Sequence, residues 1–144
     1  MIIVDVSNVA MSVSMSHFLR EKEQLTEAQL RRSFLYTFKK ITQEYAKYMG
    51  SHGLVLAFDS KHYWRTDVFP LYKKNRKKMK EESKFDFGLF YEHLNTLKAE
   101  FKDELPYRAV EVYGTEADDV ICVLSLAVSV DEPVLIYSAD KDFL

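Results

Sequence analysis

The sequence predicts an α/β domain, in which helices cover both faces of a parallel, twisted sheet. The chain has 144 residues, of which 47% are hydrophobic and 29% are charged, so it is long enough for one domain with a core. Short apolar runs alternate with longer stretches of helical periodicity. Strands and helices that alternate in this way are typical of parallel sheets, because each connection must cross back over the sheet.

Four short, β-branched apolar runs predict buried strands, since strands of a parallel sheet are covered on both faces. They are Ile2–Val6, Leu54–Phe58, Ala109–Tyr113 and Val134–Tyr137.

Three helices are predicted between these strands. Thr26 and Gln29 match a capping box, apolar residues recur at helical spacing as far as Tyr48, and Gly50 follows as a C-terminal cap. A second helix is expected over Phe87–Phe101, which carries one apolar stripe. The third, from Thr115 to about Val130, is apolar nearly all round and is therefore expected to be buried, with Cys122 in the core.

One cysteine excludes a disulfide framework and multi-cysteine zinc sites, and it suits a reducing compartment such as the cytoplasm. The longest apolar run is too short to span a bilayer, so no membrane role is expected. The net charge of −2 gives no overall attraction to nucleic acid. The segment from Lys73 to Lys80, however, holds six basic residues and no acid, which describes either a phosphate-binding surface or an ordinary solvated helix face.

Acidic residues follow every predicted strand. In parallel sheets the carboxyl ends of the strands meet at one edge, where ligands bind. The acids expected at that edge are Asp5, Asp59, Glu116, Asp118, Asp119, Asp140 and Asp142.

Carboxylates that converge in this way repel one another unless a cation neutralises them. An all-oxygen set favours Mg²⁺ or Mn²⁺ over zinc, and such an ion activates water for attack on a phosphodiester. Taken singly, each acid is better explained as a helix cap or a turn former, and it is their convergence that indicates a metal site.

The basic segment carries a resemblance to a known family. Arg65, Pro70, Tyr72, Lys73, Asn75 and Arg76 have the spacing R-x4-P-x-Y-K-x-N-R. Together with the motifs D-V-S-N, F-D, E-A-D-D and S-A-D-K-D-F, this spacing resembles the 5′-nuclease (flap endonuclease) family, and most of all its T-even bacteriophage branch. The resemblance extends over residues 1–144 and implies a single PIN-like N-terminal domain with a helical arch, residues 66–84.

The resemblance also implies roles for individual residues. Six acids match positions that hold the active-site divalent ions, directly or through water: Asp5, Asp59, Glu116, Asp118, Asp140 and Asp142. Asp119 matches an acid near the same cluster and is included in the implied metal site. Of these acids, Asp5, Asp59, Glu116 and Asp118 are also implied to be catalytic. Lys73 and Arg76 match residues that contact the scissile phosphate, and Tyr72 matches a ring on which a terminal base stacks. The positions implied to contact nucleic acid are Arg65, Tyr72, Lys73, Lys74, Arg76, Lys77 and Lys78.

The expected function is metal-dependent 5′-3′ exonuclease and flap endonuclease activity on DNA and RNA–DNA hybrids, including removal of annealed RNA primers. Family members continue beyond S-x-D-x-D to a second metal site and a duplex-binding motif. We therefore expect a truncated domain that needs a C-terminal complement, either a natural fragment or an excised piece.

Two other functions stay open at this point. Small toxin-type ribonucleases have the same acidic sheet edge but no long basic arch. A fragment without the second metal site is also consistent with a catalytically silent module that binds nucleic acid or a partner chain.

Overall fold

A computed structural model describes residues 1–143 and, for Lys77 and Lys78, the backbone alone. Its elements, in chain order, are β1 Ile2–Asp5, α1 Val6–Glu21, α2 Glu27–Glu44, η1 Ala46–Tyr48, β2 Leu54–Ala57, α3 Trp64–Val68, α4 Lys74–Glu81, α5 Phe87–Asp103, β3 Arg108–Val110, α6 Ala117–Val128, β4 Leu135–Tyr137 and η2 Lys141–Phe143.

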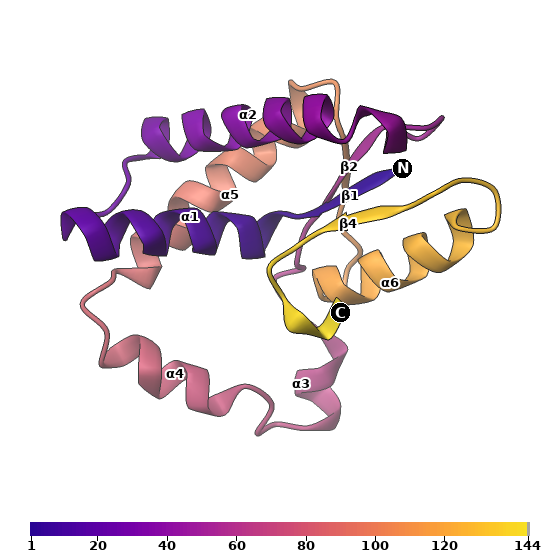
Figure 1. The fold of residues 1–144 in the computed structure, drawn as a ribbon. Coiled ribbons are helices and arrows are strands. Elements are labelled where there is room, and N and C mark those ends of the chain that lie inside the picture. The colour runs from indigo at the N-terminus through magenta and orange to yellow at the C-terminus, as the bar shows by residue number, and fades with distance from the viewer. Residues whose placement is uncertain (144) are drawn as a thin grey trace.

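The predicted parallel sheet is confirmed. Its strand order is β3-β2-β1-β4, and every pair is parallel. Helices α1, α2 and α5 lie on one face and α6 on the other, while α3 and α4 lie beyond the carboxyl ends of the strands (Figure 1). The strands are shorter than predicted, and β3 ends at Val110 rather than at Tyr113.

Strand residues alternate between two cores, as the pleat of a sheet requires. Ile2, Val4, Leu54 and Leu56 pack toward α1, α2 and α5, whereas Ile3 and Val55 pack toward α6. The larger core contains a ring cluster of Phe34, Phe38, Phe101 and Tyr107, with centroids 5.4–5.6 Å apart. Such edge-on contacts add to the stabilisation that burial of the rings already provides.

The capping box of α2 is present, with Thr26 and Gln29 bonding each other's backbone N–H groups. The helix ends at Glu44, earlier than predicted, and a short 3-10 turn carries the chain to Gly50, which has a φ of +50°. Helix α1 was not predicted, because its serine- and methionine-rich sequence has no clear apolar stripe. Asp5 caps its N-terminus by accepting a hydrogen bond from the Asn8 N–H at 3.1 Å.

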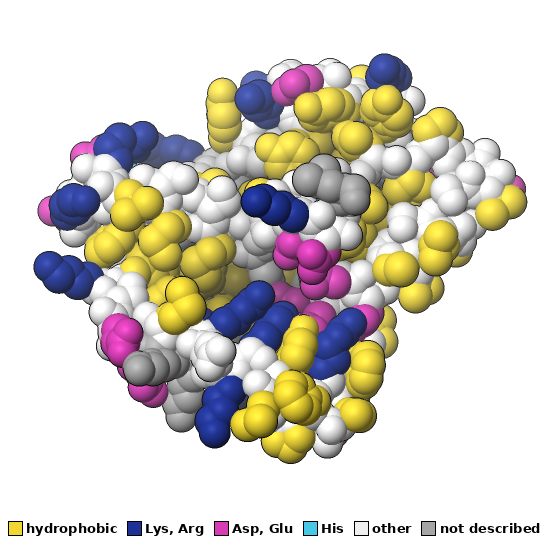
Figure 2. Space-filling view, turned by 60° about the horizontal axis from the view of Figure 1, so that its bottom comes forward, with side chains coloured by type: hydrophobic (Ala, Val, Ile, Leu, Met, Phe, Trp, Pro, Cys, Tyr) yellow, Lys and Arg dark blue, Asp and Glu magenta, His cyan; other side chains and the backbone are white. Residues whose placement is uncertain are grey.

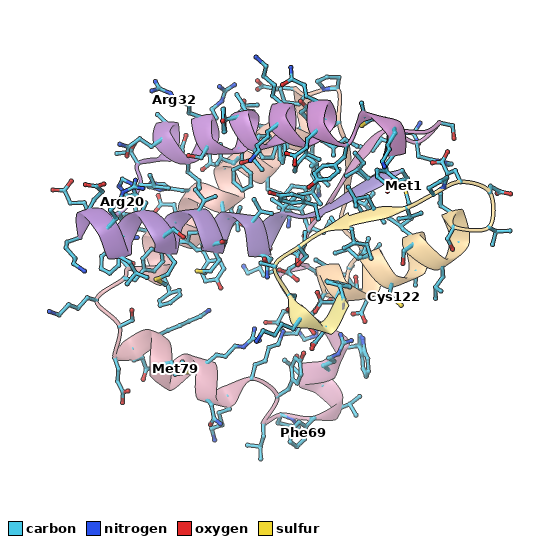
Figure 3. The ribbon with its side chains drawn as sticks, viewed as in Figure 1. Met1, Arg20, Arg32, Phe69, Met79 and Cys122 are labelled. Carbon is cyan, nitrogen blue, oxygen red and sulfur yellow. The ribbon has the colours of Figure 1, made fainter. Side chains whose placement is uncertain are left out.

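The prediction that the third helix is buried was wrong. Helix α6 buries Ala117, Val120 and Ile121 against the sheet, but Val123 and Leu126 on its other side are about two-thirds exposed. Cys122 is also exposed and lies on the side of α6 away from the sheet, not in the core (Figure 3). The sheet occupies only one side of the helix, and none of the described residues covers the other.

No helix among residues 1–143 is both long enough and apolar enough to cross a membrane.

Candidate active site at the carboxyl edge of the sheet

The predicted acids come together where the strands end. Asp5 ends β1, Asp59 follows β2, Asp140 follows β4, and Glu116 and Asp118 begin α6. Figure 2 shows acidic side chains gathered in the middle of this face, bordered by Lys and Arg side chains.

Burial and mutual repulsion shape the ionisation of these acids. Asp5 is 4% exposed, and desolvation together with the charges of Asp59 and Asp118 raises its pKa to about 6. Burial, and then the charges of Asp59 and Asp140, raise the pKa of Asp118. The four carboxylates are therefore close enough to interact electrostatically.

Hydrogen bonds hold β4 and its acids against β1. The Ser138 hydroxyl donates to Asp5 at 2.9 Å and accepts from the Asp140 N–H at 3.0 Å. The Asn8 side-chain oxygen accepts from the Ala139 N–H at 3.0 Å. Both residues lie within the motifs of the predicted site, but spacing along the chain gave no reason to assign them a role, because their partners are more than 130 residues away.

Asp59 is fastened to the start of α6. Its Oδ1 accepts a hydrogen bond from the Ala117 N–H at 2.8 Å. The Lys98 ammonium donates to the Asp59 carbonyl oxygen at 3.2 Å and also pairs with Glu111. Asp59 thus connects the end of β2 with the N-terminus of α6, which fixes both relative to each other.

Three residues of the R-x4-P-x-Y-K-x-N-R motif converge on one acid. Glu116 is 3% exposed and accepts hydrogen bonds from Arg65 Nη1 at 3.0 Å, from the Tyr72 hydroxyl at 2.9 Å and from the Lys73 ammonium. Burial alone would lower the pKa of Lys73, but its bonds to Glu116 and Tyr72 outweigh burial and raise it. The side chains that donate to Glu116 therefore come from α3, which holds Arg65, and from the turn before α4, which holds Tyr72 and Lys73.

Asp119 contacts the same arginine. Its two oxygens accept from Arg65 Nη1 and Nη2, each at 2.7 Å, and this pairing lowers the pKa of Asp119 and raises that of Arg65. Asp119 also accepts from the Glu116 N–H at 3.1 Å, which completes a capping box.

The other predicted residues lie further out. Lys74 and Arg76 are exposed on α4, and Asp142 is exposed in η2, where its N–H donates to Asp140 at 3.1 Å. The side chains of Lys77 and Lys78 lie outside the described residues.

Within the described part of the chain, no three His, Cys, Asp or Glu side chains are arranged to hold a metal ion. In this structure three side-chain donors bond to Glu116, and a backbone N–H group bonds to one oxygen each of Asp5 and Asp59. The donor set itself consists of oxygen atoms, which suits a hard divalent cation.

Comparison with known proteins decides the family. Residues 1–144 match the family of the 5′-3′ exonuclease N-terminal resolvase-like domain. The chain belongs to this family. The resemblance inferred from the motifs is thereby confirmed, and with it the PIN-like fold class.

Two relatives from different sources share this sequence pattern. Ribonuclease H of Enterobacteria phage T4 is 34% identical over 144 residues, which cover 98% of this chain and 47% of that protein. A 5′-3′ exonuclease of Mycoplasmopsis pulmonis is 29% identical over 114 residues, covering 78% of this chain and 36% of the relative. The chain therefore spans half or less of the length of these relatives.

Solved structures of phage T5 proteins share the fold. The T5 5′-exonuclease with bound zinc superposes with a TM-score of 0.75 at 19% identity, covering 99% of this chain and 50% of that one. A T5 flap endonuclease crystallised with DNA and metal ions gives a TM-score of 0.76 at 18% identity, covering 99% and 49%. These likenesses extend over the sheet, the flanking helices and the arch segment alike.

Proposed function

We propose that this chain is the N-terminal half of a divalent-metal-dependent 5′ nuclease that hydrolyses phosphodiesters at 5′ ends and flaps of DNA and of RNA–DNA hybrids. The observation that carries the proposal is the convergence of Lys73, Tyr72 and Arg65 on Glu116, at the edge where Asp5, Asp59, Asp118 and Asp140 meet. In this arrangement the acids would hold a metal ion, and the neighbouring Lys and Arg side chains would contact the phosphate of the substrate. The metal ions in the T5 structures support the same proposal.

Asp5, Asp59, Glu116, Asp118 and Asp140 would hold the ion, and Mg²⁺ or Mn²⁺ fits their oxygens best. When bound, it supplies a polarised phosphoryl oxygen and a water of lowered pKa. In the structure the Lys73 ammonium pairs with Glu116. A metal ion held by Glu116 would replace that pair, and the ammonium would then be available to contact the scissile phosphate. Arg76 is exposed on α4 and would add a second positive charge that attracts the phosphates of the nucleic acid.

We further propose that the second half of the nuclease packs on the exposed side of α6 and along β4. Val123 and Leu126 form an exposed apolar surface there, and β4 is an edge strand of the described sheet. Apolar surface of this kind marks an interaction site, and an open strand edge accepts a further strand. The relatives are about twice as long as this chain, which supplies an occupant of suitable size.

Lys73→Ala tests the proposed chemistry. In the chain combined with its complementing half, kcat for a 5′-flap DNA should fall by about a hundredfold or more, because a charge that acts on the transition state is lost. Binding of the same DNA in Ca²⁺ should weaken by no more than about threefold, since one phosphate contact contributes little to affinity.

Lys61→Ala is the matched control, because Lys61 is an exposed lysine that precedes α3 and contacts none of these acids. An unchanged kcat in Lys73→Ala would refute the role of Lys73 in the reaction.

One observation favours a second function for the chain on its own. Because the chain covers only 47% of a relative with nuclease activity in its name, the chain on its own fits a module that binds nucleic acid without cleaving it. Binding that weakens with salt while added Mn²⁺ produces no cleavage would support that function. The toxin-type ribonuclease has no such support, because the family match extends over the arch segment as well.

A further inference from the structure

The ion pair between Arg65 and Asp119 joins the two groups at two points and leaves each of them with a further bond to Glu116. Asp119 accepts from both terminal nitrogens of Arg65 and from the Glu116 N–H, while Arg65 Nη1 also donates to Glu116. A two-point pair of this kind fixes orientation as well as distance. Arg65 is about one-quarter exposed, and its guanidinium lies 4.8 Å from the Trp64 ring.

Other contacts join the same two segments. Tyr63 forms a parallel β-bridge with Gly114, and the Trp64 N–H donates to the Gly114 carbonyl oxygen at 2.8 Å. The backbone therefore holds the start of α3 to the turn before α6. The next residue, Arg65, is held to α6 by its side chain.

Backbone hydrogen bonds continue from Arg65 to Tyr72, the residue before Lys73. The Phe69 N–H donates to the Arg65 carbonyl oxygen at 2.9 Å, and the Tyr72 N–H donates to that of Phe69 at 2.8 Å. Lys73 follows with a φ of +54°, a left-handed conformation that costs about 1 kcal/mol or more outside glycine and persists only where its surroundings enforce it. Its side chain then reaches Glu116, which the Arg65–Asp119 pair also holds.

We propose that Arg65 and Asp119 are positioning residues, and that their pairing places Lys73 and Glu116 for the reaction. Asp119 acts through Arg65 rather than as a ligand of a metal ion, and Arg65 acts through Glu116 and the turn it anchors rather than by binding nucleic acid. The assignment differs from the roles that the family resemblance implied for these two residues. The effect of the pair on cleavage rests on the proposed function, whereas its effect on the position of Lys73 does not.

Hydrogen exchange of the metal-free chain tests the positioning without any cleavage. Asp119→Asn keeps the size of the side chain but weakens a charge-assisted pair, so amides of residues 69–76 should exchange about tenfold faster. Glu100→Gln is the matched control, because Glu100 pairs with Nε and Nη2 of Arg31 between α2 and α5, away from the site. It should leave exchange of residues 69–76 unchanged. Unchanged exchange in Asp119→Asn overturns the proposal.

A double-mutant cycle tests whether the pair acts through Lys73. In the chain with its complementing half, Asp119→Asn should lower kcat for a 5′-flap DNA by about tenfold in the native background and by less than about twofold in Lys73→Ala. A positioning residue has nothing left to position once Lys73 is absent, whereas a metal ligand would add its own loss. Losses that multiply in the double variant overturn the proposal.

The two experiments separate this inference from the proposed function. If no combination of halves cleaves nucleic acid, the proposed function fails while the exchange result still decides whether Arg65 and Asp119 hold the turn.

Discussion

Asp5 shows at the scale of one residue how the site conflicts with the stability of the fold. It caps α1 and accepts from Ser138, so the local structure needs its oxygens. Its burial opposes its charge and raises its pKa to about 6. A carboxylate in this position is tolerated at neutral pH at a cost in stability, which is typical of groups retained for function.

Asp5→Asn should stabilise the metal-free chain at neutral pH. The folded state binds the Asp5 proton more tightly than the unfolded state does, so the penalty is absent below about pH 4, grows up to about pH 6 and is constant above it. Asparagine keeps the cap without the charge. Urea unfolding with a chelator should show a gain of roughly 1–3 kcal/mol at pH 7.5 that disappears toward pH 4.

Asp86→Asn is the control for this measurement, because Asp86 caps α5 in the same way but is exposed. It should change the free energy of unfolding by no more than a few tenths of a kcal/mol. A loss of stability in Asp5→Asn at pH 7.5 would show that the carboxylate stabilises the metal-free fold.

At the scale of elements, α6 combines two different surfaces. Its first turn contributes Glu116, Asp118 and Asp119 to the site and its middle packs on the sheet, but its outer side is apolar and exposed. The periodicity of the sequence showed that the helix is apolar nearly all round, and burial was the natural interpretation. The same pattern fits a helix whose second apolar side binds another polypeptide. Only the structure distinguishes a fully buried helix from one with an exposed apolar side.

The exposure of Cys122 makes this surface measurable, because the chain has no other cysteine. Ellman's reagent should label the native chain stoichiometrically, at a rate within about tenfold of the rate in urea, since a buried thiol is protected by the free energy of opening. Addition of the complementing half should slow labelling, because the proposed contact covers α6.

Slow labelling of the native isolated chain would contradict the exposed position of Cys122. Labelling that stays fast in an active complex would contradict the proposed packing of the second half on α6.

At the scale of the whole molecule, the sequence predicted the parallel sheet, three of the helices, the edge at which the acids gather and the family. These features follow from local patterns, whereas the order of the strands, β3-β2-β1-β4, was not predicted and comes from the structure. Helix α1 was missed because only four of its residues are buried, Val6, Val9, Ala10 and Ser14, and the last of them is polar. The attachment of Arg65 to Asp119 and of Lys73 to Glu116 was missed because pairs separated by 43–54 residues leave no periodic signal.

The central claim is that the acids at the carboxyl edge bind a divalent cation in competition with the ammonium of Lys73. The most direct measurement is titration of the metal-free chain with Mn²⁺, followed by electron paramagnetic resonance, for the native sequence, Asp118→Asn and Lys73→Ala. We predict saturable uptake that Asp118→Asn weakens by about tenfold, because a ligand is lost, and that Lys73→Ala strengthens, because Glu116 loses a competing charge. Uptake that neither variant changes, or no saturable uptake at millimolar Mn²⁺, would contradict the account.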